Sequence, residues 1–105
     1  MLTITREVDQ WIQIGDDLFV SPTDIDADGV RLIAKGRVLG GADDGATFTK
    51  AADLAVGGEL RLGPSVVITV VGVVRDAVRL GVQVPQNISV HRKELVDQVR
   101  RAKGG

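Results

Sequence analysis

The sequence predicts an all-β fold that ends in a helix, and three observations lead to this prediction. The 105 residues include 17 Val, 7 Ile and 6 Thr, and these β-branched side chains suit a pleated sheet better than a helix. Apolar and polar residues alternate in short runs, which is typical of half-buried strands. Helical spacing of apolar residues is confined to the C-terminal tail.

The short runs give the predicted strands in chain order. They lie at residues 2–6, 12–14, 18–20, 30–34, 60–62, 66–74 and 78–84. Turn sequences rich in Gly and Asp separate consecutive strands. Pro85 ends the last of these runs, because proline has no N–H to donate to a ladder. A glycine-rich stretch at residues 40–45 predicts a flexible link between two halves of the chain.

The C-terminal tail predicts a helix at about residues 92–103. Its apolar stripe has 3–4 spacing and consists of Leu95, Val96, Val99 and Ala102. Basic residues fill the last turn, where a helix dipole favours cations. These residues either contact RNA or complement the dipole on a solvated face, and the sequence favours neither.

The composition excludes several classes of protein. With no Cys and one His, the chain has neither a disulfide framework nor a thiolate metal site, and most catalytic constellations cannot be assembled. We therefore expect no enzyme, no cofactor and no metal. Three aromatic residues are too few for a stacked aromatic RNA platform. No apolar run approaches the ~18 residues of a membrane span, and no signal peptide is recognised, so a cytoplasmic protein is expected.

The near-zero net charge hides two unequal halves. Residues 1–46 carry four basic and nine acidic residues, a net of −5, whereas residues 47–105 carry nine basic and five acidic residues, a net of +4. The second half is therefore better suited to a polyanion. Two solvated faces with no such role would give the same distribution.

The two halves also repeat each other. At an offset of 48, Gly15, Asp28 and the run 30–32 are matched by identical residues at 63, 76 and 78–80. At an offset of 44, residues 3–6 resemble residues 47–50, and a four-residue insertion within 51–58 would reconcile the offsets. We interpret this as a duplication, since a single unit of about 50 residues is marginal for a core.

The second half resembles the carbon storage regulator (CsrA/RsmA) family of bacterial post-transcriptional regulators. The resemblance rests on Val78-Arg79-Leu80-Gly81-Val82, on Pro85, and on Ile88-Ser89-Val90-His91-Arg92 before the predicted helix. The opening residues 1–6 resemble the family's first strand, and residues 12–16 resemble its second. Together these segments cover most of the chain outside residues 36–58.

The resemblance implies a dimeric fold and a function. Family members are interlocked homodimers of five-stranded units, each with a C-terminal helix. They bind GGA-containing hairpin loops of mRNA along edge strands contributed by two subunits, and thereby regulate translation or transcript lifetime. The implied partner is mRNA, and the resemblance also admits a regulatory small RNA or a protein antagonist.

This sequence is about twice as long as the family's unit. The difference in length predicts a fused pseudo-dimer. Residues 1–46 correspond to a truncated unit, and residues 47–105 to a complete unit with its helix. The two would form one intertwined β-sandwich or barrel, in which the first strand pairs with the last. We expect a monomeric pseudo-dimer, with a homodimer as the alternative. One RNA site would be intact, and a degenerate second site would use Phe48, Lys50 and residues 35–39.

The resemblance places the intact site on the first and last strands. The implied RNA-binding residues are Ile4, Thr5, Arg6, Pro85, Ser89, Val90, His91 and Arg92. The resemblance makes Arg92 the strongest candidate, because the family's key Arg stands at this point of the Val-His-Arg motif. A guanidinium can bind a phosphate or a guanine edge in fork geometry. Glu7 stands where the family usually has a second basic residue, and should weaken phosphate binding.

Other conspicuous residues have simpler explanations. Trp11 is expected in the core or an interface; stacking on RNA is the alternative, which the family resemblance does not support. Arg31 and Arg79 are expected in structural salt bridges. The cluster Asp24, Asp26 and Asp28 lacks the Glu at position 12 of an EF-hand loop, where Lys35 stands, which predicts a solvated turn. The alternative function is a protein-interaction module with the same fold and reduced RNA binding, favoured by Glu7 and the acidic first half.

Overall fold

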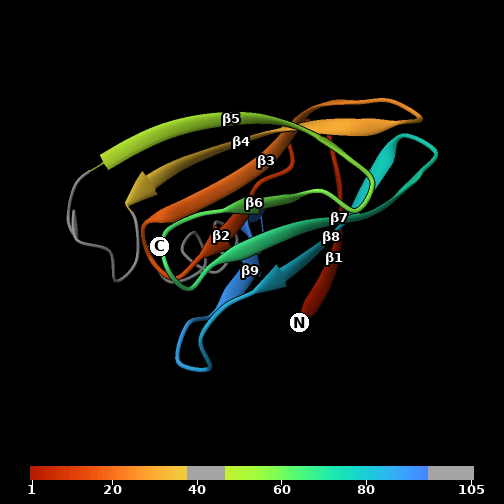
Figure 1. Cartoon of the computed structure of the whole chain (residues 1–105). Helices are drawn as coiled ribbons and strands as arrows, with labels where there is room; N and C mark the ends of the chain where they lie inside the picture. Colours follow the sequence, from red (N-terminus) through yellow and green to blue (C-terminus); the bar gives the residue numbers. More distant parts are fainter. Residues whose placement is uncertain (38–46, 95–105) are drawn as a thin grey trace, which may run out of the picture.

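The structure is a computed structural model that describes residues 1–37 and 47–94. In this part the chain forms nine antiparallel strands (Figure 1). They are β1 (Leu2–Glu7), β2 (Ile12–Ile14), β3 (Leu18–Ile25), β4 (Gly29–Arg37), β5 (Thr47–Ala55), β6 (Glu59–Arg61), β7 (Val67–Val74), β8 (Ala77–Gln83) and β9 (Val90–Arg92). The predicted all-β class is confirmed. The main omission is β5, of which the sequence indicated only the first residues.

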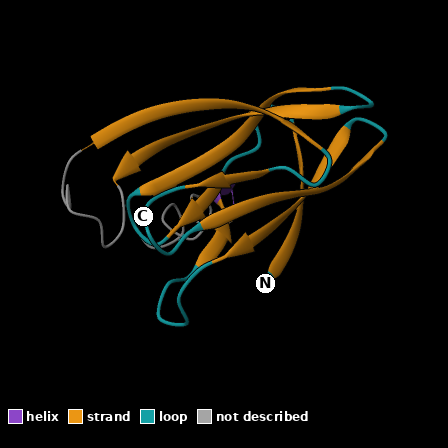
Figure 2. Cartoon of the chain, in the orientation of Figure 1, coloured by secondary structure: helices purple, strands orange, loops and turns teal. Residues whose placement is uncertain are grey.

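The strands form two sheets (Figure 2). Each sheet takes strands from both halves of the chain. The four-stranded sheet has the order β1-β8-β7-β6, and the five-stranded sheet has the order β5-β4-β3-β2-β9. Hence β1 leaves the first half to pair with β8, while β5 and β9 flank strands of the first half.

A single hydrophobic core joins the two sheets. Alternation within the strands builds it: on β8, Val78, Leu80 and Val82 are buried, and Arg79 between them is exposed. The fully buried large side chains are Ile12, Ile14, Leu18, Val20, Leu32, Leu62, Val66, Ile68, Val70, Val78, Leu80 and Val82. Both halves contribute equivalent positions, so neither half has a core of its own.

The two halves repeat at a constant offset of 48 in their strand registers. Ile12 pairs with Val20 as Leu60 pairs with Ile68. The register shift of the β3–β4 hairpin lies between Pro22 and Asp24, and that of β7–β8 lies between Val70 and Gly72, at the same offset. The turns agree as well, because Gly15 and Gly63 both have positive φ, at 62° and 79°.

The register corrects the offset of 44 predicted for the first strands. Arg6 pairs with Val78, and its counterpart Val30 pairs with Leu54, so Leu54 and not Lys50 occupies the position of Arg6. The offset of 48 therefore extends to β1 and β5, without an insertion within 51–58. The four-residue similarity was misleading because the register between paired strands is set by the whole buried face and not by a short polar motif.

The predicted pairing of the first strand with the last is also wrong. β1 pairs with β8, and β9 pairs with β2 in the other sheet. The two strands share no ladder: β1 is an edge strand of the four-stranded sheet, and β9 is an edge strand of the five-stranded sheet.

The predicted C-terminal helix falls mostly outside the described residues. Arg92, at its expected start, is the last residue of β9, and only Lys93 and Glu94 beyond it have a described, helical backbone. The predicted flexible link at residues 40–45 lies wholly outside the described residues.

Candidate nucleic-acid interface

Side chains and backbone groups bring β1 and β9 close together, although the strands do not pair. Arg6 on β1 donates from Nη1 to Oε2 of Glu94, which lies two residues beyond β9, at 2.9 Å. The carbonyl of Trp11 accepts from the same Nη1 at 3.4 Å and from the backbone N–H of Lys93 at 2.9 Å. The edge of one sheet therefore adjoins the edge of the other, and both strands of the predicted site lie there.

Arg6 is buried, with only 4% of its side chain exposed. Its Nε donates to the carbonyl of Thr5 at 2.9 Å, in addition to the contacts with Trp11 and Glu94. The hydrogen bond from Arg6 holds the pKa of the Glu94 carboxyl below its ordinary value, against a smaller opposing effect of burial. The guanidinium therefore carries a compensated charge and holds the segment after β9 in place.

The exposed candidates lie on β9 and the loop before it. Ser89, His91 and Arg92 are exposed, and Val90 is half-buried. The strand is held by β2: the N–H of Gly15 donates to the carbonyl of Ser89 at 2.8 Å, and His91 lies opposite Gln13. Arg92 thus presents a guanidinium from a strand anchored at both ends.

The remaining candidates lie on β1 and in the loop before β9. Ile4 is 7% exposed, and its side chain belongs to the core. Thr5 is exposed beside it. Pro85 is half-buried, and its carbonyl accepts from the N–H of Ile88 at 3.0 Å, which closes the loop before β9.

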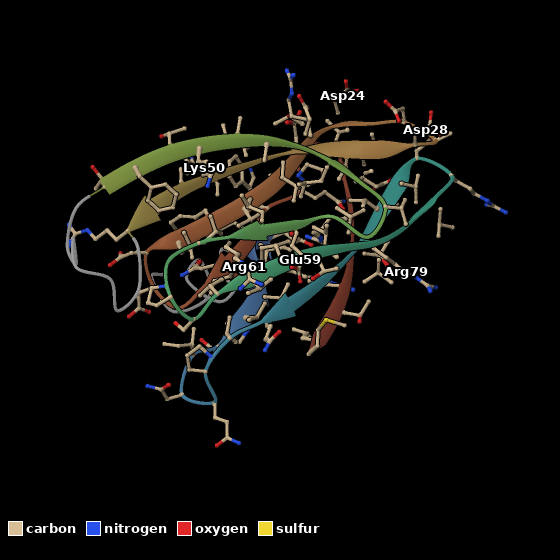
Figure 3. The ribbon with its side chains drawn as sticks, viewed as in Figure 1. Asp24, Asp28, Lys50, Glu59, Arg61 and Arg79 are labelled. Atoms are coloured by element: carbon tan, nitrogen blue, oxygen red, sulfur yellow. The ribbon has the colours of Figure 1, made fainter. Side chains whose placement is uncertain are left out.

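The predicted second site is not symmetric with the first. Phe48 is half-buried against the core, whereas Lys50 on β5 is exposed and matches Leu2 by register (Figure 3). The counterparts of Ile4 and Arg6 are Ala52 and Leu54. Among the described residues, β6 has one neighbour only, on the side of β7.

An aromatic and basic cluster near β9 was not predicted. Trp11, Phe19, Lys35 and Lys93 line a hollow of about 200 Å³. The Nζ atom of Lys35 lies 4.6 Å from the centre of the Trp11 ring, and that of Lys93 lies 5.8 Å from the centre of the Phe19 ring. Strand alternation does carry the signal for Phe19, because it lies between the inward-facing Leu18 and Val20.

Some of the charged residues elsewhere have structural contacts. Arg31 forms the expected salt bridge, with Asp53 at 2.7 Å, which raises the pKa of Arg31 and lowers that of Asp53 through their hydrogen bond. Within the described ranges Arg79 has no such partner. Asp26 accepts from the N–H groups of Asp28 and Gly29 and so closes the β3–β4 turn.

The described residues contain neither a metal-binding cluster nor a membrane-spanning helix. Across 1–37 and 47–94, no group of three or more His, Asp or Glu side chains is placed to hold a metal ion. In the same part of the chain, no helix has the length and apolar character needed to span a membrane.

Comparison with known proteins shows a family similarity in the second half of the chain. No solved structure matches the chain. Residues 55–101, which include β6 to β9, match the family model of CsrA, the global regulator protein family. That family consists of RNA-binding regulators that bind mRNA and are not enzymes. On this match, the second half of the chain is similar to the carbon storage regulator family.

Proposed function

We propose that this protein is a post-transcriptional regulator that binds GGA-containing hairpin loops of mRNA at the adjoining edges of β1 and β9. The observation that carries the proposal is the contact between these edges through Arg6 and Glu94, beside the exposed Arg92. A loop bound there would meet the backbone of β1 and the guanidinium of Arg92 together. Arginine is the side chain best suited to a phosphate or a guanine edge.

The proposal includes a fused pseudo-dimer made of a unit at 1–46 and a unit at 47–105. Its support is the constant offset of 48 in registers, bulges and turns, together with the exchange of β1, β5 and β9 between the halves. Two chains are then unnecessary to complete a site, and a single chain of 11.1 kDa is expected in solution.

One site per chain follows from the unequal edges. The β1 edge has Arg6 where the β5 edge has Leu54, and β6 has no described counterpart of β9 beside it. Mass measurement should therefore give a complex of one chain with one hairpin. A complex of two chains on one hairpin would contradict this stoichiometry.

The direct test is RNA binding by the Arg92→Ala variant. Titration of a labelled GGA hairpin should show affinity reduced by roughly 5- to 150-fold, which corresponds to one bidentate contact. Arg61→Ala is the matched control, because Arg61 is an exposed arginine three strands from β1, about 14 Å away. Absence of hairpin binding by the wild type at low salt would overturn the proposal.

A second candidate function is a protein-interaction module with reduced RNA binding. It is favoured by the compensated charge of Arg6 and by the net charge of −5 on residues 1–46. This candidate predicts that the wild type and Arg92→Ala bind the hairpin equally weakly. The same titration therefore separates the two functions.

A further inference from the structure

The hollow lined by Trp11, Phe19, Lys35 and Lys93 is not required by the fold. At the offset of 48, the first three positions are taken by Glu59, Val67 and Gln83 in the other half. The strand pairing is the same in both halves. Phe19 pairs with Gln13 and Lys35, and Val67 pairs with Arg61 and Gln83. The same strands are therefore built without an aromatic ring or a lysine at these positions.

The hollow also takes an unusual share of the aromatic residues. The chain has three, and Trp11 and Phe19 are half-buried at the hollow and do not belong to the hydrophobic core. Aromatic side chains normally dominate a core, where they bury the most surface. Their position outside it leaves flat apolar ring surface at the hollow.

The chemistry of the hollow suits one base of a single-stranded nucleic acid. Bases stack on aromatic rings, and ammonium groups nearby neutralise the phosphates. A volume of about 200 Å³ is below the roughly 300–1,000 Å³ of sites for whole small molecules, which restricts the ligand to one ring system. Because Lys35 is exposed, its ammonium can move from the Trp11 ring to a phosphate without leaving a buried charge.

The hollow continues the proposed RNA site. Lys93 follows Arg92 directly, and its backbone N–H donates to the carbonyl of Trp11. That carbonyl also accepts from Arg6, so one peptide group links the hollow to both edge strands. Of the β9 residues, His91 lies opposite Gln13 and shares the hollow's face of the sheet, whereas Arg92 lies opposite Ile12 on the other face. An RNA held by Arg92 would therefore reach the hollow around the edge of β9.

We propose that this hollow binds one unpaired base of the bound RNA by stacking on its aromatic rings, with Lys35 and Lys93 placed for the adjacent phosphates. The proposal rests on the proposed function, since it adds a contact to the same RNA site. On this proposal, the outer face of the five-stranded sheet binds an RNA base. The outer face of the four-stranded sheet has no such role.

The test uses the fluorescence of Trp11, which is the only tryptophan in a chain without tyrosine. A labelled GGA hairpin with a single-stranded flank, and a single-stranded oligonucleotide without GGA, are titrated against the full chain. Anisotropy reports binding of the RNA, and quenching of Trp11 reports a base in the hollow. We expect the hairpin to bind and to quench Trp11 over the same range of concentration.

Variants link the quenching to affinity. Phe19→Leu should weaken hairpin binding by at least about fivefold, the lower end of the contribution of one stacked base. Lys35→Gln should weaken it and reduce its salt dependence. Arg61→Gln is the control, because it removes one positive charge from the equivalent face of the other sheet and should leave both readouts unchanged.

The outcomes separate the two proposals. Hairpin binding with unchanged Trp11 emission and an unaffected Phe19→Leu variant would overturn the stacking hollow and leave the proposed function intact. Quenching by the oligonucleotide without hairpin binding would support the hollow and overturn the GGA specificity. No binding of either RNA would overturn both.

Discussion

At the scale of single residues, the most informative contact is the ion pair of Arg6 and Glu94. A buried guanidinium is stable only with compensation, and Glu94 supplies it together with the carbonyls of Thr5 and Trp11. The residue that the family resemblance assigns to RNA is therefore already engaged within the protein. RNA binding and local stability should respond in opposite directions when the pair is broken.

The Glu94→Gln variant tests this opposition. Loss of the carboxylate should lower the free energy of unfolding at pH 7 by about 1 kcal/mol, with allowance for screening of a half-exposed group. Hairpin affinity should rise, because the charge of Arg6 is released. Glu59→Gln, which breaks the exposed pair with Arg61, is the matched control and should change neither measurement appreciably.

The same pair predicts a pH dependence. Arg6 lowers the pKa of Glu94 in the folded state, so this contribution is complete above the carboxyl's ordinary pKa and is lost as the pH falls through the lowered value. The difference in unfolding free energy between wild type and Glu94→Gln should therefore shrink in acid. Chemical denaturation across this range checks it, and a difference independent of pH would contradict it.

At the scale of elements, β9 depends on the turn that follows β2. Gly15 adopts φ of 62°, and its N–H donates to the carbonyl of Ser89 at the start of β9. Gly63 has the same conformation after β6, but that edge has no described strand beside it. Both glycines thus adopt a positive φ, but only Gly15 donates a hydrogen bond that anchors a described neighbouring strand.

Substitution of each glycine by alanine separates these roles. Gly15→Ala and Gly63→Ala should each destabilise the fold by roughly 1–2 kcal/mol, the cost of a left-handed non-glycine residue. Gly15→Ala should also weaken hairpin binding, because it disturbs the anchor of β9. Thermal unfolding and RNA titration measure the two effects, and equal RNA affinities would argue against the role of β9.

At the scale of the whole molecule, the halves share one core and should unfold together. Leu32 and Leu80 occupy equivalent positions at the offset of 48, and both are completely buried. Leu32→Ala and Leu80→Ala should each cost about 2–5 kcal/mol. Each variant should still show a single denaturation transition, by Trp11 fluorescence and by circular dichroism. Two separate transitions would show that the halves fold independently.

The sequence was sufficient for the class of fold and for most of the strands. Alternation identified the inward residues of β1 and β8, because burial on one face imposes a period of two. It failed for most of β5, where Ala51 and Ala52 carry little apolar contrast and no described strand pairs with the outer edge.

The candidate site was predictable in membership but not in geometry. Motif similarity pointed to Arg6 and Arg92, but no local signal indicates the ion pair of Arg6 with Glu94, which lies 88 positions away in the chain. Trp11 and Lys35 are 24 positions apart in the chain and contact each other across three neighbouring strands. Such contacts depend on strand order, which no short motif contains.

By itself the sequence determined that the chain is all-β, that it repeats, and that its second half carries the family motif, because these properties follow from local periodicity and residue identity. Only the tertiary structure decided the uniform offset of 48, the exchange of strands between sheets, and the meeting of β1 with β9 at adjoining edges. These features depend on which buried faces pack together over one common core, and long-range packing selects that arrangement among many with the same local pattern.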